Sequence, residues 1–123
     1  MRLLLAAFLL IHGIAHLPGF LVDWQLRSLP ELPYRTTIFA GSVEVGTAGI
    51  RAIGLAWLLA AVAFALAALG LVMRWGSWQS VAYTAIAASV FLTVAAWPEA
   101  RLGLFANVVL MLLILVGQRV QWL

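Results

Sequence analysis

The stretch Ile11–Phe20, IHGIAHLPGF, places two histidines inside the first long apolar segment of the chain. His12 and His16 are four residues apart, so they share one face of a helix. Pro18 lacks a backbone donor and disfavours helical geometry in the residue before it, which predicts an interruption near Pro18-Gly19. Irregular backbone in a membrane is tolerated only against protein or a wet cavity. We therefore expect this stretch to face the interior of the protein.

The composition predicts a membrane protein. Hydrophobic residues make up 66% of the 123 residues and charged residues only 9%, whereas soluble domains carry about 25% charged residues. Four apolar runs approach the ~20 residues that cross a hydrocarbon core. Cysteine is absent, which excludes disulfides and thiolate metal sites. The basic residues are spread along the chain, so no nucleic-acid partner is expected.

We predict an all-α, polytopic membrane protein with four transmembrane helices in an antiparallel bundle. Residues 1–123 form one domain, with helices at about 3–22, 52–73, 80–97 and 102–116. The start of the chain resembles a signal peptide, but the apolar run continues too far and lacks an A-x-A-like site, so we expect a retained helix. Residues 23–51 form the one long loop, in which Gly41-Ser42 suggests a small hairpin. A short amphipathic segment before Pro30 is an equal alternative.

The charge distribution predicts the orientation. Arg2, Arg74 and Arg119 lie in short segments without acids, which favours cytoplasmic termini and an extracytoplasmic long loop in an inner membrane. Tryptophans near the predicted helix ends are expected to form an aromatic belt: Trp24, Trp57, Trp75, Trp78, Trp97 and Trp122.

Five polar side chains are predicted to form a column that descends from the outer face. With a rise of about 1.5 Å per residue, His16 and Asn107 both lie roughly 8 to 9 Å below the outer ends of their helices. Thr93 lies at roughly 6 Å, Ser89 at about 12 Å and His12 at about 15 Å. The charged residues expected at the mouth of the column are Arg51, Glu99 and Arg101.

This residue set favours a lipophilic ligand with a polar head, quinone-like or lipid-like, in a pocket open to the outer face. The expected contacts are His12, His16, Asn107, Thr93 and Ser89, and His16 is favoured over His12 because it shares the depth of Asn107. For a redox-active ligand, a histidine would also relay protons within a membrane redox system.

Metal and haem are less favoured. His12 and His16 are the only candidate metal ligands; they share the spacing of the zinc-binding H-E-x-x-H motif but lack its glutamate. Both histidines lie on one helix, whereas haem between helices usually takes histidines from two.

A second hypothesis makes the chain a non-catalytic accessory or structural subunit of a membrane complex. The histidines would then supply hydrogen bonds within the bundle, worth about 0.6 kcal/mol each on average. The expected partners are the lipid bilayer and either further copies of the chain or a larger complex. An independent membrane enzyme ranks last, and the sequence leaves open whether the protein catalyses a reaction.

Three sequence patterns carry a resemblance to known proteins: His12-Gly13-x-x-His16-x-x-Gly19-Phe20, Gly54-Leu55-x-Trp57-Leu58-Leu59-Ala60-Ala61 and Trp97-x-x-Ala100-Arg101-x-Gly103-x-x-x-Asn107. The chain resembles an uncharacterised family of small bacterial four-helix integral membrane proteins. The resemblance covers all four helices and omits most of residues 23–51. A looser, architectural similarity to DoxX-like membrane proteins, some of which are linked to quinone-coupled oxidation, implies a quinone only by analogy.

Overall fold

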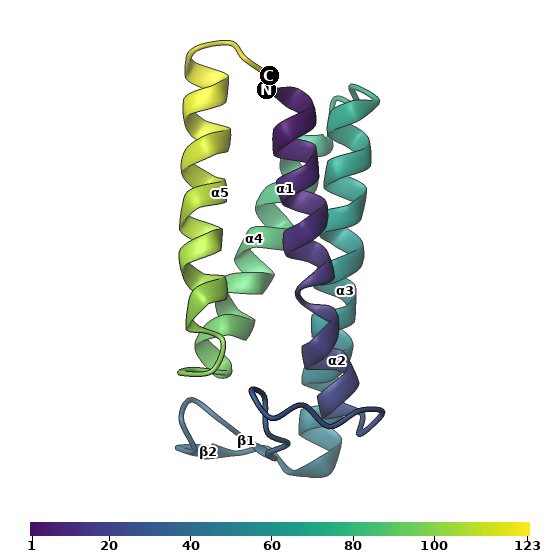
Figure 1. Ribbon diagram of the computed structural model, residues 1–123, viewed down its shortest axis with the longest axis vertical. Helices are drawn as coiled ribbons and strands as arrows, with labels where there is room; N and C mark the ends of the chain where they lie inside the picture. Colours follow the sequence, from purple (N-terminus) through teal and green to yellow (C-terminus); the bar gives the residue numbers. More distant parts are fainter.

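The computed structural model describes residues 1–123, which form five helices and one small hairpin (Figure 1). The elements are α1 (Arg2–Ile14), α2 (Leu17–Asp23), β1 (Thr37–Ile38), β2 (Val43–Glu44), α3 (Gly46–Val72), α4 (Trp78–Ala95) and α5 (Arg101–Arg119). Four stretches are long and apolar enough to cross a membrane: Arg2–Asp23, Gly46–Val72, Trp78–Ala95 and Arg101–Arg119. The prediction of a helical chain with four potential spans is confirmed.

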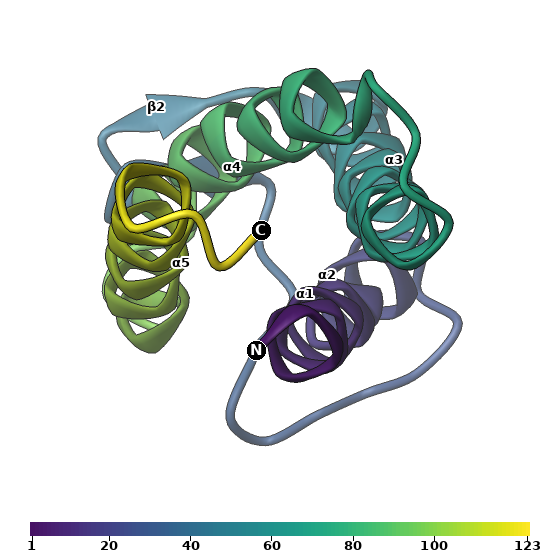
Figure 2. The ribbon, with the colours of Figure 1, turned by 90° about the horizontal axis from the view of Figure 1, so that it is seen from above.

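The helices lie side by side, with both termini at one end of the molecule and the hairpin at the other (Figure 1). Viewed from above, α1, α3, α4 and α5 follow one another around a common centre (Figure 2). Helices α1 and α2 pack on α3, α3 packs on α4, and α4 packs on α5, whereas α1 and α5 touch one another least. The interface between α1 and α5 is therefore the loosest side of the arrangement.

The first span is broken between α1 and α2, about one turn before the predicted Pro18-Gly19 position. The backbone N–H of His16 donates to the Gly13 carbonyl over 3.0 Å, which is a tighter turn than the α-helical pattern. The His12 carbonyl is thereby released and accepts a hydrogen bond from His16 Nδ1 at 2.7 Å instead. Pro18 lies in the first turn of α2, where its missing donor is tolerated.

Helix α3 begins at Gly46 rather than at about residue 52, so the connecting loop covers residues 24–45 instead of 23–51. The Gly46 N–H donates to a Glu44 carboxylate oxygen at 2.9 Å, which satisfies one of the free donors at the start of the helix. Ile50 in the second turn is buried. Capping and burial together extend the helix beyond its strongly apolar part.

The predicted hairpin is confirmed. Strands β1 and β2 are antiparallel, with Thr37 opposite Glu44 and Ile38 opposite Val43. The Phe39 N–H donates to the Ala95 carbonyl at 2.8 Å, which holds the hairpin against the end of α4.

Helix α5 continues to Arg119, past the predicted end at about residue 116. The chain then turns back, because Trp122 N–H donates to the Gly117 carbonyl at 2.8 Å and Gln121 adopts a φ of 59°. A Cβ at Gly117 would lie 2.8 Å from Leu123 Cδ1. The glycine therefore lets the terminal residues lie against the helix instead of ending it.

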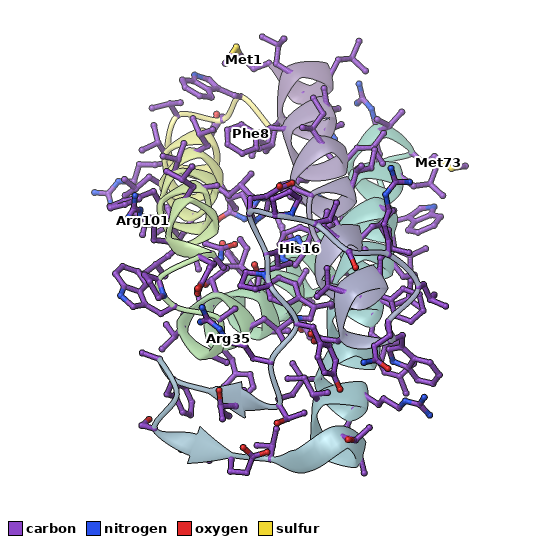
Figure 3. All side chains as sticks on the ribbon, turned by 60° about the horizontal axis from the view of Figure 1, so that its bottom comes forward. Met1, Phe8, His16, Arg35, Met73 and Arg101 are labelled. Carbon is purple, nitrogen blue, oxygen red and sulfur yellow. The ribbon has the colours of Figure 1, made fainter.

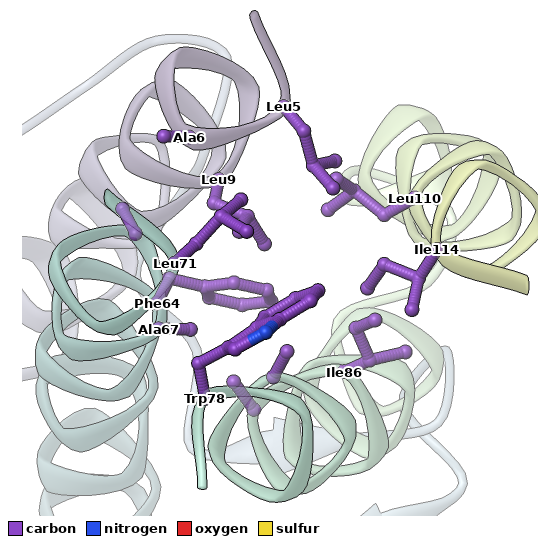
Figure 4. Packing of buried hydrophobic residues seen from close by; sticks show 13 residues of the cluster. Leu5, Ala6, Leu9, Phe64, Ala67, Leu71, Trp78, Ile86, Leu110 and Ile114 are labelled. Atoms are coloured by element: carbon purple, nitrogen blue, oxygen red, sulfur yellow. The ribbon is translucent and has the colours of Figure 1, made fainter. Parts of the chain in front are cut away.

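A cluster of 13 buried hydrophobic residues fills the centre between the four long helices (Figure 4). Phe64 and Trp78 meet there with Leu110 and Ile114 of α5. Trp57 and Trp78 are both buried, so these two side chains do not lie on the surface as the predicted aromatic belt requires. Trp57 is covered by α2, because its ring packs against Gly19.

Helices α1 and α3 approach closely at Gly13. A Cβ at this position would lie 2.8 Å from the Cβ of Phe64 and 3.1 Å from the Ala61 carbonyl oxygen. Small residues allow such backbone contact between membrane helices. This contact fixes the height at which the two histidines face α3.

Candidate functional site

The five polar residues predicted to form a column meet in the interior of the protein. All of them are buried, and they come from the first span, α4 and α5: His12, His16, Ser89, Thr93 and Asn107. His16 is seen at the centre of the molecule in Figure 3.

Four of these side chains form one continuous hydrogen-bonded network. His12 Nε2 lies 2.9 Å from Asn107 Oδ1, and Asn107 Nδ2 donates to Ser89 Oγ at 2.9 Å. Ser89 Oγ lies 2.6 Å from His16 Nε2. Since His16 Nδ1 contacts the His12 carbonyl, the network returns to the helix where it began. Thr93 stands beside the network and donates to the Ser89 carbonyl at 2.9 Å.

The His12 carbonyl sets the direction of every hydrogen bond in the network. A carbonyl oxygen only accepts, so His16 Nδ1 carries the hydrogen and, in the neutral ring, Nε2 is the acceptor. The Ser89 hydroxyl therefore donates to His16 and accepts from the Asn107 amide. The Asn107 oxygen then faces His12, whose Nε2 must carry the hydrogen. His12 is thus fixed as the Nε2–H tautomer, with a lone pair on Nδ1.

Nδ1 of His12 is the only ring nitrogen of the two histidines without a partner. No fully buried side-chain nitrogen or oxygen in the chain lacks a hydrogen bond, so this atom keeps access to the space beside it. The sequence favoured His16 as the ligand contact, but both ring nitrogens of His16 are engaged in hydrogen bonds.

Aromatic rings surround the network. His16 lies 5.3 Å from the Trp57 ring and 5.1 Å from the Phe64 ring, and His12 lies 4.9 Å from Phe64, measured between ring centroids. These apolar walls exclude water from the polar groups, which strengthens their hydrogen bonds.

The residues predicted at the mouth of the column divide into two groups. Glu99 lines a pocket of about 60 Å³ beneath the loop, and its carboxylate pairs with Arg35 at 2.8 Å. Arg51 instead stacks over the Trp24 ring at 5.2 Å, and Arg101 is exposed at the start of α5. Neither of these two arginines lines the pocket.

Trp57 lines this outer pocket and also contacts His16. None of the four network residues, nor Thr93, lines the pocket. The indole ring thus lies between the pocket and the network, and the two are separate features of the structure.

A second pocket, of about 110 Å³, lies between α1 and the C-terminal segment. All seven residues that line it are hydrophobic: Met1, Leu4, Leu5, Phe8, Leu113, Trp122 and Leu123. Figure 3 shows Phe8 on the side of α1 that faces α5. This pocket could not be predicted from the sequence, because it forms only when the terminal residues turn back towards α1.

The histidines are poorly suited to a metal ion. No group of three or more His, Cys, Asp or Glu side chains lies close enough to share one. His16 uses both ring nitrogens in hydrogen bonds, and His12 offers only Nδ1. These two side chains therefore present a single free nitrogen, whereas zinc takes at least three protein ligands.

Comparisons with protein-family models, curated proteins and solved structures find no match. The family resemblance noted in the sequence stays a prediction.

Proposed function

We propose that this protein is a small integral membrane protein that binds a lipophilic molecule with a polar head. The observation that carries the proposal is the position of the apolar pocket relative to the polar network. Phe8, which lines the pocket, and His12 are four residues apart on α1, so they share a face and are separated by about 6 Å along the helix. A tail in the pocket would place its head beside His12 and Asn107.

The pocket is accessible from the side of the protein. Met1 is 60% exposed, Leu4 68% and Trp122 42%. In a bilayer these residues contact lipid, so a lipophilic molecule reaches the pocket without crossing water. The volume of about 110 Å³ is below the ~300 Å³ of a typical small-molecule site. The pocket therefore holds part of a tail, and the rest of the tail lies among the lipids.

The proposal includes the arrangement in the membrane. The four spans form an antiparallel bundle in the inner membrane, with both termini cytoplasmic and the hairpin loop outside. Arg2, Arg74 and Arg119 lie in the terminal segments and the turn after α3, which supports this orientation by the positive-inside rule. The tail would then lie in the inner half of the bilayer, with a quinone-like or a lipid-like molecule as the candidate ligand. A quinone-like ligand would place the protein in a membrane redox system.

The test uses a variant that fills the apolar pocket. Phe8→Trp should remove a copurifying lipophilic molecule, as measured by organic extraction and mass spectrometry of the purified full-length protein. Leu3→Trp is the matched control, because Leu3 lies on the same helix, is 70% exposed and does not line the pocket. Equal ligand content in both variants and the wild type, or no ligand in any of them, would refute the proposal.

A second candidate function is that of an accessory or structural subunit, as a homo-oligomer or within a larger complex. It is supported by the hydrogen bonds that link the three helices, since no fully buried side-chain nitrogen or oxygen lacks a partner. Replacing His12 and His16 together by leucine separates the two candidates. Loss of the ligand from a protein that still folds supports ligand binding, whereas loss of the fold without any ligand ever being extracted supports the structural function.

A further inference from the structure

We infer that the head of the ligand is a hydroxyl group that donates a hydrogen bond to His12 Nδ1. The inference rests on the proposed function and names the chemical class of the ligand: a lipophilic phenol, hydroquinone or alcohol rather than a ketone or quinone.

The free nitrogen of His12 is a hydrogen-bond acceptor. His12 Nε2 must carry its hydrogen because it faces the Asn107 oxygen at 2.9 Å. Nδ1 of the neutral ring is then an acceptor with no partner in the chain, and it is not fully buried. An acceptor is satisfied only by a donor, and a hydroxyl is the neutral donor that a lipophilic molecule carries most readily.

A ligand whose head can only accept a hydrogen bond would require the hydrogen bonds of the network to point in other directions. A carbonyl head needs a hydrogen on Nδ1, so Nε2 becomes an acceptor and Asn107 must turn its amide nitrogen towards His12. The Asn107 oxygen then faces Ser89, 2.9 Å away in the present arrangement, and takes the Ser89 hydrogen. His16 Nε2, which receives that hydrogen at 2.6 Å, is left without a donor.

His16 cannot avoid this loss of a hydrogen-bond donor by changing its own tautomer. Its Nδ1 hydrogen is held by the His12 carbonyl at 2.7 Å, so the neutral ring cannot change tautomer without losing that bond. A carbonyl ligand therefore leaves one buried acceptor unpaired, whereas a hydroxyl ligand leaves the whole network unchanged. The network discriminates between the two through a residue that touches neither ligand.

The experiment compares two probes, of which one carries a hydroxyl donor and the other has that hydrogen replaced by a methyl group. 4-Nonylphenol carries a hydroxyl, and 4-nonylanisole has a methyl ether in its place. Binding to the full-length protein is measured by isothermal titration calorimetry in one detergent, with empty micelles as the blank. The phenol is expected to bind about ten-fold more tightly, as for a hydrogen bond in a water-poor site.

Two variants test whether His12 causes the preference for the phenol and whether both probes bind in the apolar pocket. His12→Leu removes the Nδ1 lone pair and puts no other acceptor in its place, so phenol binding should fall to the level of the ether. Phe8→Trp should abolish the binding of both probes, with Leu3→Trp as the matched control.

The outcomes distinguish the two proposals. Equal binding of phenol and ether to the wild type overturns the inference and leaves the proposed function standing, and this comparison needs no variant that must fold. An unchanged preference for the phenol in His12→Leu also overturns it. If neither probe binds the wild type, or if Phe8→Trp binds both normally, the proposed function itself fails.

Discussion

The hydrogen bond between His12 and Asn107 should couple α1 to α5 energetically. It is the only hydrogen bond between side chains of these two helices, and its length is 2.9 Å. A double-mutant cycle with His12→Leu, Asn107→Leu and the double variant measures its contribution. Side-chain hydrogen bonds between membrane helices average about 0.6 kcal/mol, with a maximum of about 1.7 kcal/mol. We expect a coupling energy of about 1 kcal/mol, because both partners are buried and no water replaces the lost bond.

Each single variant should lower the free energy of unfolding by more than the coupling energy between His12 and Asn107. Asn107→Leu also removes the 2.9 Å bond to Ser89 and leaves the His12 N–H buried without a partner, so its total cost should be about 2 kcal/mol. The free energy of unfolding is measured in mixed micelles by titration with a denaturing detergent, followed by far-ultraviolet circular dichroism.

The control cycle uses Ile11→Ala and Val108→Ala. These residues neighbour His12 and Asn107 on the same helices but are 67% and 51% exposed, so their effects should add to within about 0.5 kcal/mol. A coupling between His12 and Asn107 below about 0.3 kcal/mol would refute the reasoning, because the network would then not hold α1 and α5 together.

Three further predictions use the same unfolding measurement. Gly13→Ala should destabilise the protein by about 1 to 3 kcal/mol, since its Cβ would lie 2.8 Å from the Cβ of Phe64; a stability equal to that of the wild type would mean that α1 and α3 do not touch there. Glu99→Gln breaks the 2.8 Å ion pair with Arg35, whose side chain is 49% exposed, so it should cost at most about 1 kcal/mol and less at high salt. A larger, salt-independent loss would contradict this. Ser89→Ala removes the hydroxyl of the 2.6 Å bond to His16 and should cost about 1 to 3 kcal/mol; a neutral effect would mean that this hydroxyl does not stabilise the folded protein through the network.

Local chemistry made the spans and the break predictable. The length of each apolar run and the missing donor of Pro18 act within a few residues, so they need no knowledge of the fold. The boundaries at Gly46 and Arg119 differ from the prediction because tertiary contacts decide them. Ile50 is buried, and Leu123 lies against Gly117.

Depth along the helices identified the four network residues and Thr93, because a helix rises by a nearly constant distance per residue. Depth along the helices did not identify which of these side chains form hydrogen bonds with one another. The sequence matched His16 with Asn107, whereas the structure pairs Asn107 with His12 and His16 with Ser89. Each residue also turns the helix by about 100°, so the pairing depends on how each helix is rotated.

The sequence by itself determined that the chain has four potential membrane spans, that the first span is interrupted near Pro18-Gly19, and that histidine, serine, threonine and asparagine lie at neighbouring depths. The tertiary structure alone decided that these groups form one network, that His12 rather than His16 keeps a free nitrogen, and that an apolar pocket lies one turn away. Apolar length and helical rise are local properties of the chain. Hydrogen-bond direction and pocket shape arise only where α1, α4, α5 and the C-terminal segment meet.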